Sequence, residues 1–355
     1  MNTVITILVT LVMFGFLIAV HELGHYLVAR LFHVGIIEYS IGMGPAIHTW
    51  EGKNNDFSIR ALPIGGYVRM VGEPGEELPE NLPKAIGKTS INDVSVWKRM
   101  LIVLAGPFTN LVISFLLMFV LVTTSSHLAS TTVASFQENN VSSQYGLQAE
   151  DTILKVNGRT IHCFPDLSYA VMMDGVKPVD ILVERNGSEV LLEGVRFAPS
   201  EEDGLTLGTF DFYVHEKPKT VWNLIYESFW QGWNSIYVTL DSFRQLFTGR
   251  FGLEALGGPV AIGEQVGNVI KQSPSFLDTL RYLGSMTALI SVSLGIMNLL
   301  PIPALDGGRF VIYAIEGIRR KPLPKKVETA MTAGTMILLF ILMALVFLKD
   351  LIHLF

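Results

Sequence analysis

The sequence predicts a polytopic α-helical membrane protein with about four transmembrane helices, a membrane-associated β-region and one compact α/β module. Three observations support this fold class. The 355-residue chain is 50% hydrophobic and only 16% charged, against about 25% charged residues in an ordinary soluble domain. Its mean hydropathy is +0.43. The apolar residues are concentrated in four runs, each close to the roughly 20 residues that cross a hydrocarbon core.

The same composition excludes several classes of protein. A soluble enzyme with so few charged residues could not cover its surface, and a disordered chain would be rich in charge and poor in apolar residues. The net charge of −6 gives no support for nucleic-acid binding. The single cysteine, Cys163, excludes an internal disulfide, a zinc site built from several cysteines and an iron–sulfur cluster.

Four long apolar runs are the candidate membrane helices. They cover Thr3–Ala29, Met100–Thr124, Tyr282–Leu300 and Thr332–Leu348. The first run is not typical of a signal peptide, because no Lys or Arg precedes it and it continues to about residue 29.

Basic residues near the ends of these runs predict the orientation. Arg30 follows the first run, and Lys98 and Arg99 precede the second. The segment between the third and fourth runs carries six Lys or Arg residues, at 309, 319, 320, 321, 325 and 326. We therefore expect both of these segments to be cytoplasmic, and residues 125–278 and both termini to be extracytoplasmic.

The segments between the runs differ in character. Residues 34–70 are Gly-rich with short apolar alternation, which is typical of strands and turns, and the acidic, Pro-rich residues 72–93 predict a flexible loop. Residues 130–214 have the pattern of a compact α/β module, with a helix near 165–174 and a hairpin signal at Asn186-Gly187. Residues 220–248 predict an amphipathic helix rich in Trp and Tyr, which either lies at the membrane interface or packs against the module.

These patterns predict the following division of the chain: 1–33, the first transmembrane helix; 34–97, a cytoplasmic-side membrane-associated β-region and loop; 98–125, the second transmembrane helix; 126–215, the module; 216–278, an extracytoplasmic amphipathic or interfacial segment; 279–320, the third transmembrane helix with a Leu-Asp-Gly-Gly segment; and 328–355, the fourth transmembrane helix.

Charge interrupts the first run at His21-Glu22-Leu23-Gly24-His25, an H-E-x-x-H motif. On a helix, His21 and His25 lie on one face, where two imidazoles can hold one zinc ion and Glu22 can act as base toward a water molecule. Ionisable groups inside a membrane segment are costly and usually functional. The alternative is a set of polar side chains that reach the interface from a helix end. His21 lies about 27 Å along the helix from Thr3, at ~1.5 Å per residue, so the motif is expected toward the cytoplasmic side.

A catalytic zinc needs a third protein ligand and an open position for water. The third run ends in two prolines, Pro301 and Pro303, followed by Asp306 in an apolar, Gly-flanked setting. Irregular backbone at membrane depth is tolerated where it lines a cavity. Asp306 is therefore the candidate third ligand, although the same spacing also fits an N-cap for a helix that starts at Gly307. Asn298 is either a polar contact between helices or a substrate-binding residue.

In these motifs the chain resembles the site-2 proteases, which are intramembrane zinc metalloproteases. It is most similar to the bacterial branch that includes the regulator-of-sigma-E protease. The resemblance covers most of the chain and is carried by the following motifs in this order: His21–His25, Gly42–Gly44, Pro63–Val68, Gly106–Asn110, Gly257–Val260, Asn298–Pro303 and Leu305–Gly308.

The resemblance implies that His21, His25 and Asp306 bind Zn²⁺ and that Glu22 is the general base. It implies that Asn298 and the segment Gly42, Met43 and Gly44 help to place the substrate as an extended strand. The 126–215 module is similar to a PDZ domain, through Gly146-Leu147 and the segment 151–158. Where the well-known Gram-negative member carries two such domains, this chain has one. Arg309 stands where a His often follows the paired glycines, at a position that is not a ligand.

The family further implies the biological setting. The expected substrates are transmembrane segments, such as those of an anti-sigma factor already trimmed by an upstream site-1 protease, or remnant signal peptides. The expected location is the bacterial inner membrane, and the expected role is stress-response signalling by regulated intramembrane proteolysis.

Two other classes are compatible with parts of the pattern. A transporter can use a helix broken near Pro301 as a substrate site, but it predicts repeated halves, and the sequence has no long internal repeat. A non-catalytic PDZ scaffold anchored in the membrane leaves Glu22 without a role. Metal analysis together with the activity of a Glu22→Gln variant separates these two classes from a protease.

Overall fold

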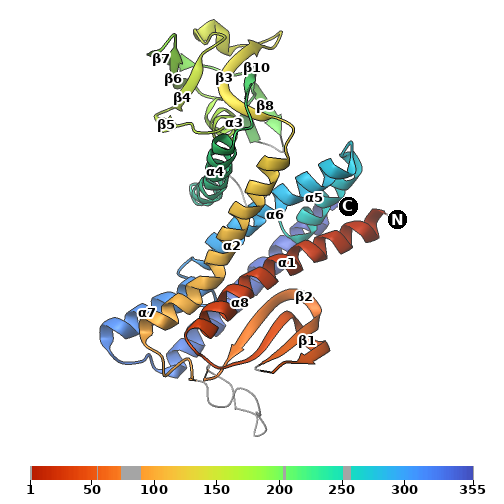
Figure 1. Ribbon diagram of the computed structural model, residues 1–355, viewed down its shortest axis with the longest axis vertical. Coiled ribbons are helices and arrows are strands. Elements are labelled where there is room, and N and C mark those ends of the chain that lie inside the picture. The colour runs from red at the N-terminus through yellow and green to blue at the C-terminus, as the bar shows by residue number, and fades with distance from the viewer. Residues whose placement is uncertain (1, 54, 73–88, 203–204, 251–256, 355) are drawn as a thin grey trace. The chain divides into compact units, whose positions relative to one another are not determined.

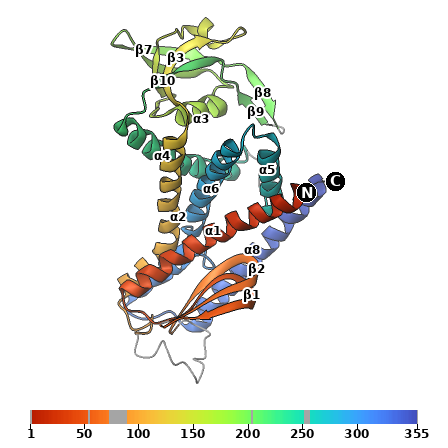
Figure 2. The ribbon, with the colours of Figure 1, turned by 45° about the vertical axis from the view of Figure 1, so that its right-hand side comes forward.

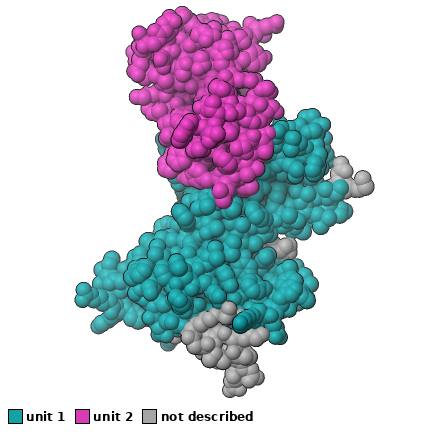
Figure 3. Space-filling view, viewed as in Figure 1, with its two compact units in different colours: residues 1–114, 239–355 teal, residues 115–238 magenta. Residues whose placement is uncertain are grey.

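A computed structural model describes residues 2–53, 55–72, 89–202, 205–250 and 257–354. The chain divides into two compact units (Figure 3): unit 1 comprises residues 1–114 and 239–355, and unit 2 comprises residues 115–238. Most of the loop expected at 72–93 lies outside the described residues.

Among the described residues, four helices are long and apolar enough to cross a membrane. They are α1 (Asn2–Leu31), α2 (Val96–Thr124), α6 (Phe276–Asn298) and α8 (Lys325–Leu354). Each contains one of the four apolar runs, or nearly all of it, so the prediction of four helices of spanning length is confirmed.

A β-sheet built from two long, bent strands lies beside α1 (Figures 1 and 2). These strands, β1 (Ile36–Glu51) and β2 (Asp56–Met70), are antiparallel. Residues 38–41 pair with residues 56–59 and also with residues 66–69, because both strands fold back on themselves. Residues 36–41 are therefore interior to the sheet, and residues 66–70 form one of its edges.

One cluster of buried apolar side chains attaches this sheet to the end of α1 and the beginning of α2. Its members come from the end of α1, both strands, the segment before α2 and α2 itself: Ala29, Val34, Ile36, Val68, Met70, Ile91, Val94 and Ile102. Burial of each such side chain contributes roughly 1.5–3 kcal/mol. The sheet is thus held against the part of α1 that carries the His-Glu motif.

The third apolar run ends in a tight reversal. Leu299 follows α6, and α7 (Asp306–Arg319) begins after the two prolines. Gly307 and Gly308 lie directly against the reversing backbone. A Cβ atom added at Gly307 would lie 2.2 Å from the carbonyl oxygen of Leu299, and one added at Gly308 would lie 2.1 Å from the carbonyl oxygen of Ile302. Only glycine fits at these two positions, and this contact fixes where Asp306 stands.

A short helix, α5 (Pro259–Gln272), packs against α1, α6 and α8. Its first turn is capped from α8, where the buried carboxylate of Asp350 accepts hydrogen bonds from the backbone N–H groups of Gly258 and Ala261, at 3.0 and 3.2 Å. A Cβ atom at Gly258 would lie 2.6 Å from this carboxylate. The start of α5, at the Gly-Gly-Pro-Val segment, is therefore where α5 is hydrogen-bonded to α8.

Unit 2 contains an antiparallel sheet in the order β10-β3-β4-β6-β7, with β5 paired to β4. A second, two-stranded sheet is β8–β9. The elements are β3 (Leu128–Phe136), η1 (Ser142–Tyr145), β4 (Thr152–Val156), β5 (Arg159–Thr160), α3 (Phe164–Asp174), β6 (Val179–Arg185), β7 (Ser188–Val195), β8 (Pro199–Glu202), β9 (Leu205–Gly208) and β10 (Phe212–Lys217). The predicted helix is α3, and Asn186-Gly187 joins β6 to β7 with both residues at positive φ, as a type I′ turn requires.

The aromatic helix α4 (Val221–Phe247) contacts the module through its middle, between Trp230 and Tyr237. Trp230 stacks on His162 at 3.4 Å between ring centroids, and Arg159 lies over the ring of Tyr237 while it hydrogen-bonds Asn234. Packing against the module, one of the two expectations for this helix, is therefore observed. Trp222 remains 80% exposed, so the prediction of an interfacial face remains open for that residue.

Candidate metal centre

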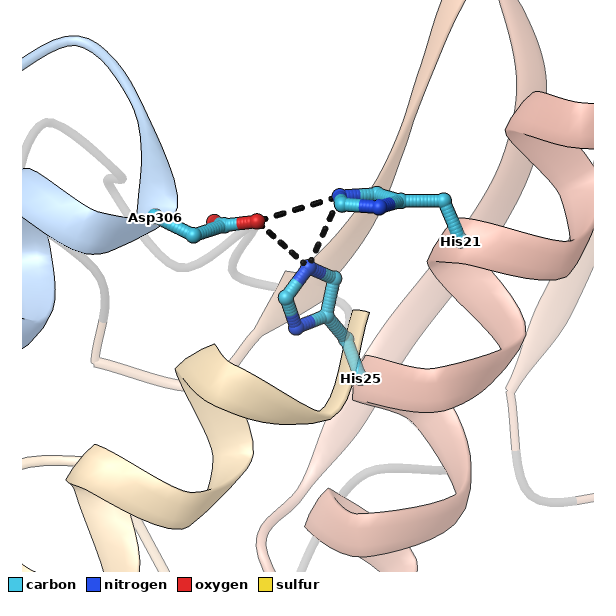
Figure 4. A group of neighbouring side chains, drawn as sticks. All are labelled: His21, His25 and Asp306. Atoms are coloured by element: carbon cyan, nitrogen blue, oxygen red, sulfur yellow. Dashed lines mark hydrogen bonds and ion pairs between the residues drawn. The ribbon is translucent and has the colours of Figure 1, made fainter. Parts of the chain in front are cut away.

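The two histidines of the motif lie one turn apart on α1 and point the same way (Figure 4). Their Nε2 atoms are 3.3 Å apart. Both side chains are nearly buried, with 13% of His21 and 11% of His25 exposed. Two neutral imidazole nitrogens directed at one point are the arrangement that binds a transition metal.

Asp306 completes a three-residue cluster. Its Oδ2 lies 3.1 Å from His21 Nε2 and 3.3 Å from His25 Nε2, and the three ligand atoms lie within 4.8 Å of one another. The residue is the first of α7, and Leu305 occupies the N-cap position. The alternative interpretation of Asp306 as the N-cap is therefore wrong, because its carboxylate turns toward the histidines.

The Asp306 carboxylate supplies a test of whether a metal fits. Its Oδ2 atom is buried and makes no hydrogen bond of acceptable geometry, although both imidazoles are close. A buried acceptor without a hydrogen bond needs another partner. Two nitrogens and one carboxylate oxygen form the donor set of a His₂-carboxylate zinc site, which leaves a fourth position for water or substrate. The residues present fit zinc.

Helix α2 supports this cluster from behind. The Nδ1 atom of His25 donates to the carbonyl oxygen of Ile102 at 2.8 Å, and the buried side chain of Asn110 lies 3.4 Å from Nδ1 of His21. Between them, a Cβ atom at Gly106 would lie 2.3 Å from Nε2 of His25. Ile102, Gly106 and Asn110 are four residues apart, so all three lie on the face of α2 that meets the histidines.

A cavity of about 320 Å³ adjoins the cluster. It is lined by His21, Glu22, His25 and Asp306, by Met43 of β1, by Gly66, Tyr67 and Val68 of β2, and by residues of α2, α7 and α8. Glu22 is part of this wall without belonging to the three-donor cluster. The Glu22 side chain lies against the sheet, because a Cβ atom at Gly66 of β2 would lie 3.1 Å from its Cγ atom. Burial, together with the charge of Glu22, raises the pKa of Tyr39 to about 12.

The remaining predicted site residues are less closely gathered. Gly42 and Gly44 have positive φ angles of 91° and 84°. Arg60 donates to the carbonyl oxygen of Gly44 and to the buried carboxylate of Glu38, which fixes this part of β1. Asn298 is the last residue of α6 and is half-buried. Among the described residues that line the cavity, Met43 is present, whereas Gly42, Gly44 and Asn298 are not.

The sequence assigned no role to Ile102, Gly106 or Asn110, although the last two belong to a motif that carries the resemblance. A signal was available for Asn110, because an amide inside an otherwise apolar run needs a polar partner. No sequence signal could have identified Ile102, because its contribution is a backbone carbonyl.

A family model and several named relatives match this chain over nearly all of its length. The model of peptidase family M50 matches residues 9–342. Relatives that carry the name "Putative zinc metalloprotease" include one from Fusobacterium nucleatum, 32% identical, with 99% of each chain covered. Another, from Clostridium acetobutylicum, is 33% identical, with 98% of this chain and 97% of the relative covered. A third, from Clostridium perfringens, is 34% identical, with 98% of each covered.

Proposed function

Since this chain belongs to peptidase family M50, the site-2 protease family of membrane zinc metalloproteases, we propose that it cuts the transmembrane segments of other membrane proteins. The observation that supports this proposal most strongly is the three-donor cluster of His21, His25 and Asp306 beside a cavity of about 320 Å³, with two of its members on an apolar helix of spanning length.

In this proposal His21, His25 and Asp306 hold the zinc ion, and Glu22 acts as general base. When bound, zinc supplies Lewis acidity toward water and toward the carbonyl of the scissile bond. The carboxylate of Glu22 takes a proton from the attacking water and passes it to the nitrogen of the leaving amine. Its place in the cavity wall, next to the histidines and outside the donor cluster, suits a group that moves protons and binds no metal.

Substrate binding in this proposal uses the edge of the sheet. Within the described residues, the register pairs residues 66–70 with residues 36–41 alone, and Gly66, Tyr67 and Val68 line the cavity. An unwound substrate can add to this edge as a further strand. Both residues 36–47 and residues 57–70 are candidate edge strands by their sequence pattern, and the cavity lining favours 57–70. Met43, between Gly42 and Gly44, would contact the strand, and Asn298 would hold its backbone.

We further infer that the 126–215 module has a PDZ-like role as a gate. It would admit a substrate only after an upstream protease has trimmed it, and the substrate would be an anti-sigma factor or a remnant signal peptide. An enzyme gated in this way cuts a single-span substrate that has a short external tail and spares the same span carrying a folded external domain. Equal cleavage of both would refute gating.

The inferred orientation in a bacterial inner membrane places the module and both termini outside the cytoplasm. Cys163 is buried, and burial raises the pKa of its thiol, so it is unsuitable for labelling. A Cys163→Ala, Ser188→Cys variant presents an exposed thiol at the start of β7 instead. An impermeant reagent added outside the cell should label it, and labelling from the cytoplasmic side alone would refute the orientation.

The proposed activity is tested with model substrates in proteoliposomes. A continuous helix hides every amide in its own hydrogen bonds, so unwinding must precede the cut. Proline costs about 3 kcal/mol in a helix interior and glycine about 1 kcal/mol, so substrates with Pro or Gly near the cut should be cleaved faster than a uniformly Leu-rich span. Asn298→Ala should slow cleavage of all of them, and Asn268→Ala, at an exposed asparagine of α5, is the control. Equal rates across the series would contradict the strand-pairing account.

A further inference from the structure

The amide of Asn110 is in an unusual position for a polar side chain. Asn110 is fully buried in the middle of α2, and its Oδ1 atom has no hydrogen-bond partner. Its other terminal atom, Nδ2, lies 3.4 Å from Nδ1 of His21. Leaving a buried amide oxygen without a donor is destabilising, so a donor is expected to reach it in the working protein.

The chemistry of the histidines identifies that donor. Both imidazoles direct Nε2 toward Asp306. A neutral imidazole that offers the Nε2 lone pair to a metal carries its proton on Nδ1, and that N–H needs an acceptor. For His25 the acceptor is the carbonyl oxygen of Ile102.

The corresponding N–H of His21 points at the Asn110 amide. A 180° turn of the amide exchanges Oδ1 and Nδ2 with almost no change in shape. After this turn, Oδ1 would accept the proton of His21 Nδ1, and the unpartnered oxygen would be satisfied.

We propose that Asn110 is a positioning residue that holds His21 in the tautomer able to bind zinc through Nε2. The proposal rests on the proposed ligand set. Asn110 does not touch the metal; it acts through His21, as Ile102 acts through His25. Helix α2 thereby sets the tautomers of both histidines on α1.

The surrounding contacts hold Asn110 in place for this role. The Ser291 hydroxyl on α6 donates to the backbone carbonyl of Asn110 at 2.8 Å. One turn further along α2, the Ser114 hydroxyl makes an equivalent contact to the carbonyl of Ala288 at 2.9 Å. Ser114 is equally buried and also bridges α2 to α6, so it provides a matched control without a contact to either histidine.

The proposal is tested by zinc affinity of the full-length protein, measured by competition with a chelator. Asn110→Leu keeps the volume and removes the acceptor, so zinc affinity should fall about 10–100-fold. Asn110→Asp can only accept from Nδ1–H, so it should keep affinity near that of the wild type. Ser114→Ala should leave affinity unchanged.

Two outcomes would overturn the proposal. If Asn110→Leu binds zinc as tightly as the wild type, the amide does not position His21. If Asn110→Asp loses zinc as severely as Asn110→Leu, the amide acts as a donor or as packing. His21→Ala separates this failure from failure of the ligand set, because it must lose zinc if His21 is a ligand at all.

A measurement on the wild type covers the case in which the Asp variant does not fold. In zinc-loaded protein with ¹⁵N-labelled histidine, the His21 signals, identified by their loss in His21→Ala, should report a protonated, hydrogen-bonded Nδ1. A proton on Nε2 of His21 would refute the proposal without any substitution at Asn110.

Discussion

Helices α1 and α8 are alike in sequence and differ in the structure. Both are 30 residues long, and their mean hydropathies over the apolar window are 2.7 and 2.5. Yet 11% of the α1 window is buried within the protein, against none of the α8 window. Helix α1 carries two members of the metal cluster, His21 and His25, whereas the buried contact described for α8 is at its end, where Asp350 caps α5.

The difference arises from close backbone packing that hydropathy does not measure. At Gly24, inside the His-Glu motif, a Cβ atom would lie 2.3 Å from the Ala105 carbonyl oxygen on α2. At Gly334 on α8, nothing lies within 4 Å of the same position. Membrane helices approach closely where small residues face each other, and here that approach brings α2 against the histidines.

The largest effect is expected from removing a proposed ligand. A site with three protein ligands is expected to hold about one zinc ion per chain. His21→Ala and Asp306→Ala should each reduce the zinc content well below this value. Met343→Ala, on the exposed surface of α8, should keep full zinc. Metal analysis of the purified variants checks this prediction. Full zinc and activity in Asp306→Ala would mean that the third ligand is another residue.

A smaller but sharp contrast is expected between two glycines. Gly106→Ala places a methyl group against His25, so we expect lost zinc and a destabilisation of about 1–3 kcal/mol from overpacking. Gly334→Ala, which meets open space, should leave both zinc content and thermal unfolding close to those of the wild type. Equal effects of the two substitutions would contradict the close approach of α1 and α2.

The smallest effect is expected at the attachment of α8. Asp350→Ala removes the acceptor of two backbone N–H groups at the start of α5, and loss of a helix cap costs about 0.5–2 kcal/mol. Thermal unfolding should shift modestly while zinc content stays unchanged. Loss of zinc in this variant would show that the two helices are coupled more tightly than their packing indicates.

Much of the fold could be predicted because it depends on pattern. The four apolar runs are each found in a long helix, and Asn186-Gly187 forms a turn because both residues tolerate positive φ. His21 and His25 were recognisable from their spacing alone. Asp306 was ambiguous, because an aspartate beside Gly307 suits an N-cap as well as a ligand, and only its position relative to α1 distinguishes the two.

The rest depends on contacts between distant segments. The carbonyl of Ile102 and the room left at Gly106 involve residues about 80 positions from His25 and carry no side-chain signal. The folding of β1 and β2 into four paired segments, with residues 66–70 at the cavity, requires a register that alternation does not specify. Likewise, the amphipathic pattern of α4 fits both a membrane interface and the contact with His162 that is observed.

The central claim, that Glu22 performs proton transfer beside a zinc ion that it does not bind, is tested most directly by measuring zinc content and cleavage together in Glu22→Gln. The substitution removes the base and nearly preserves the shape. We expect about one zinc per chain, an unchanged thermal unfolding profile, and no detectable cleavage of a Gly/Pro-containing model substrate. Appreciable turnover with full zinc would contradict Glu22 as the base, and loss of zinc would contradict its place outside the ligand set.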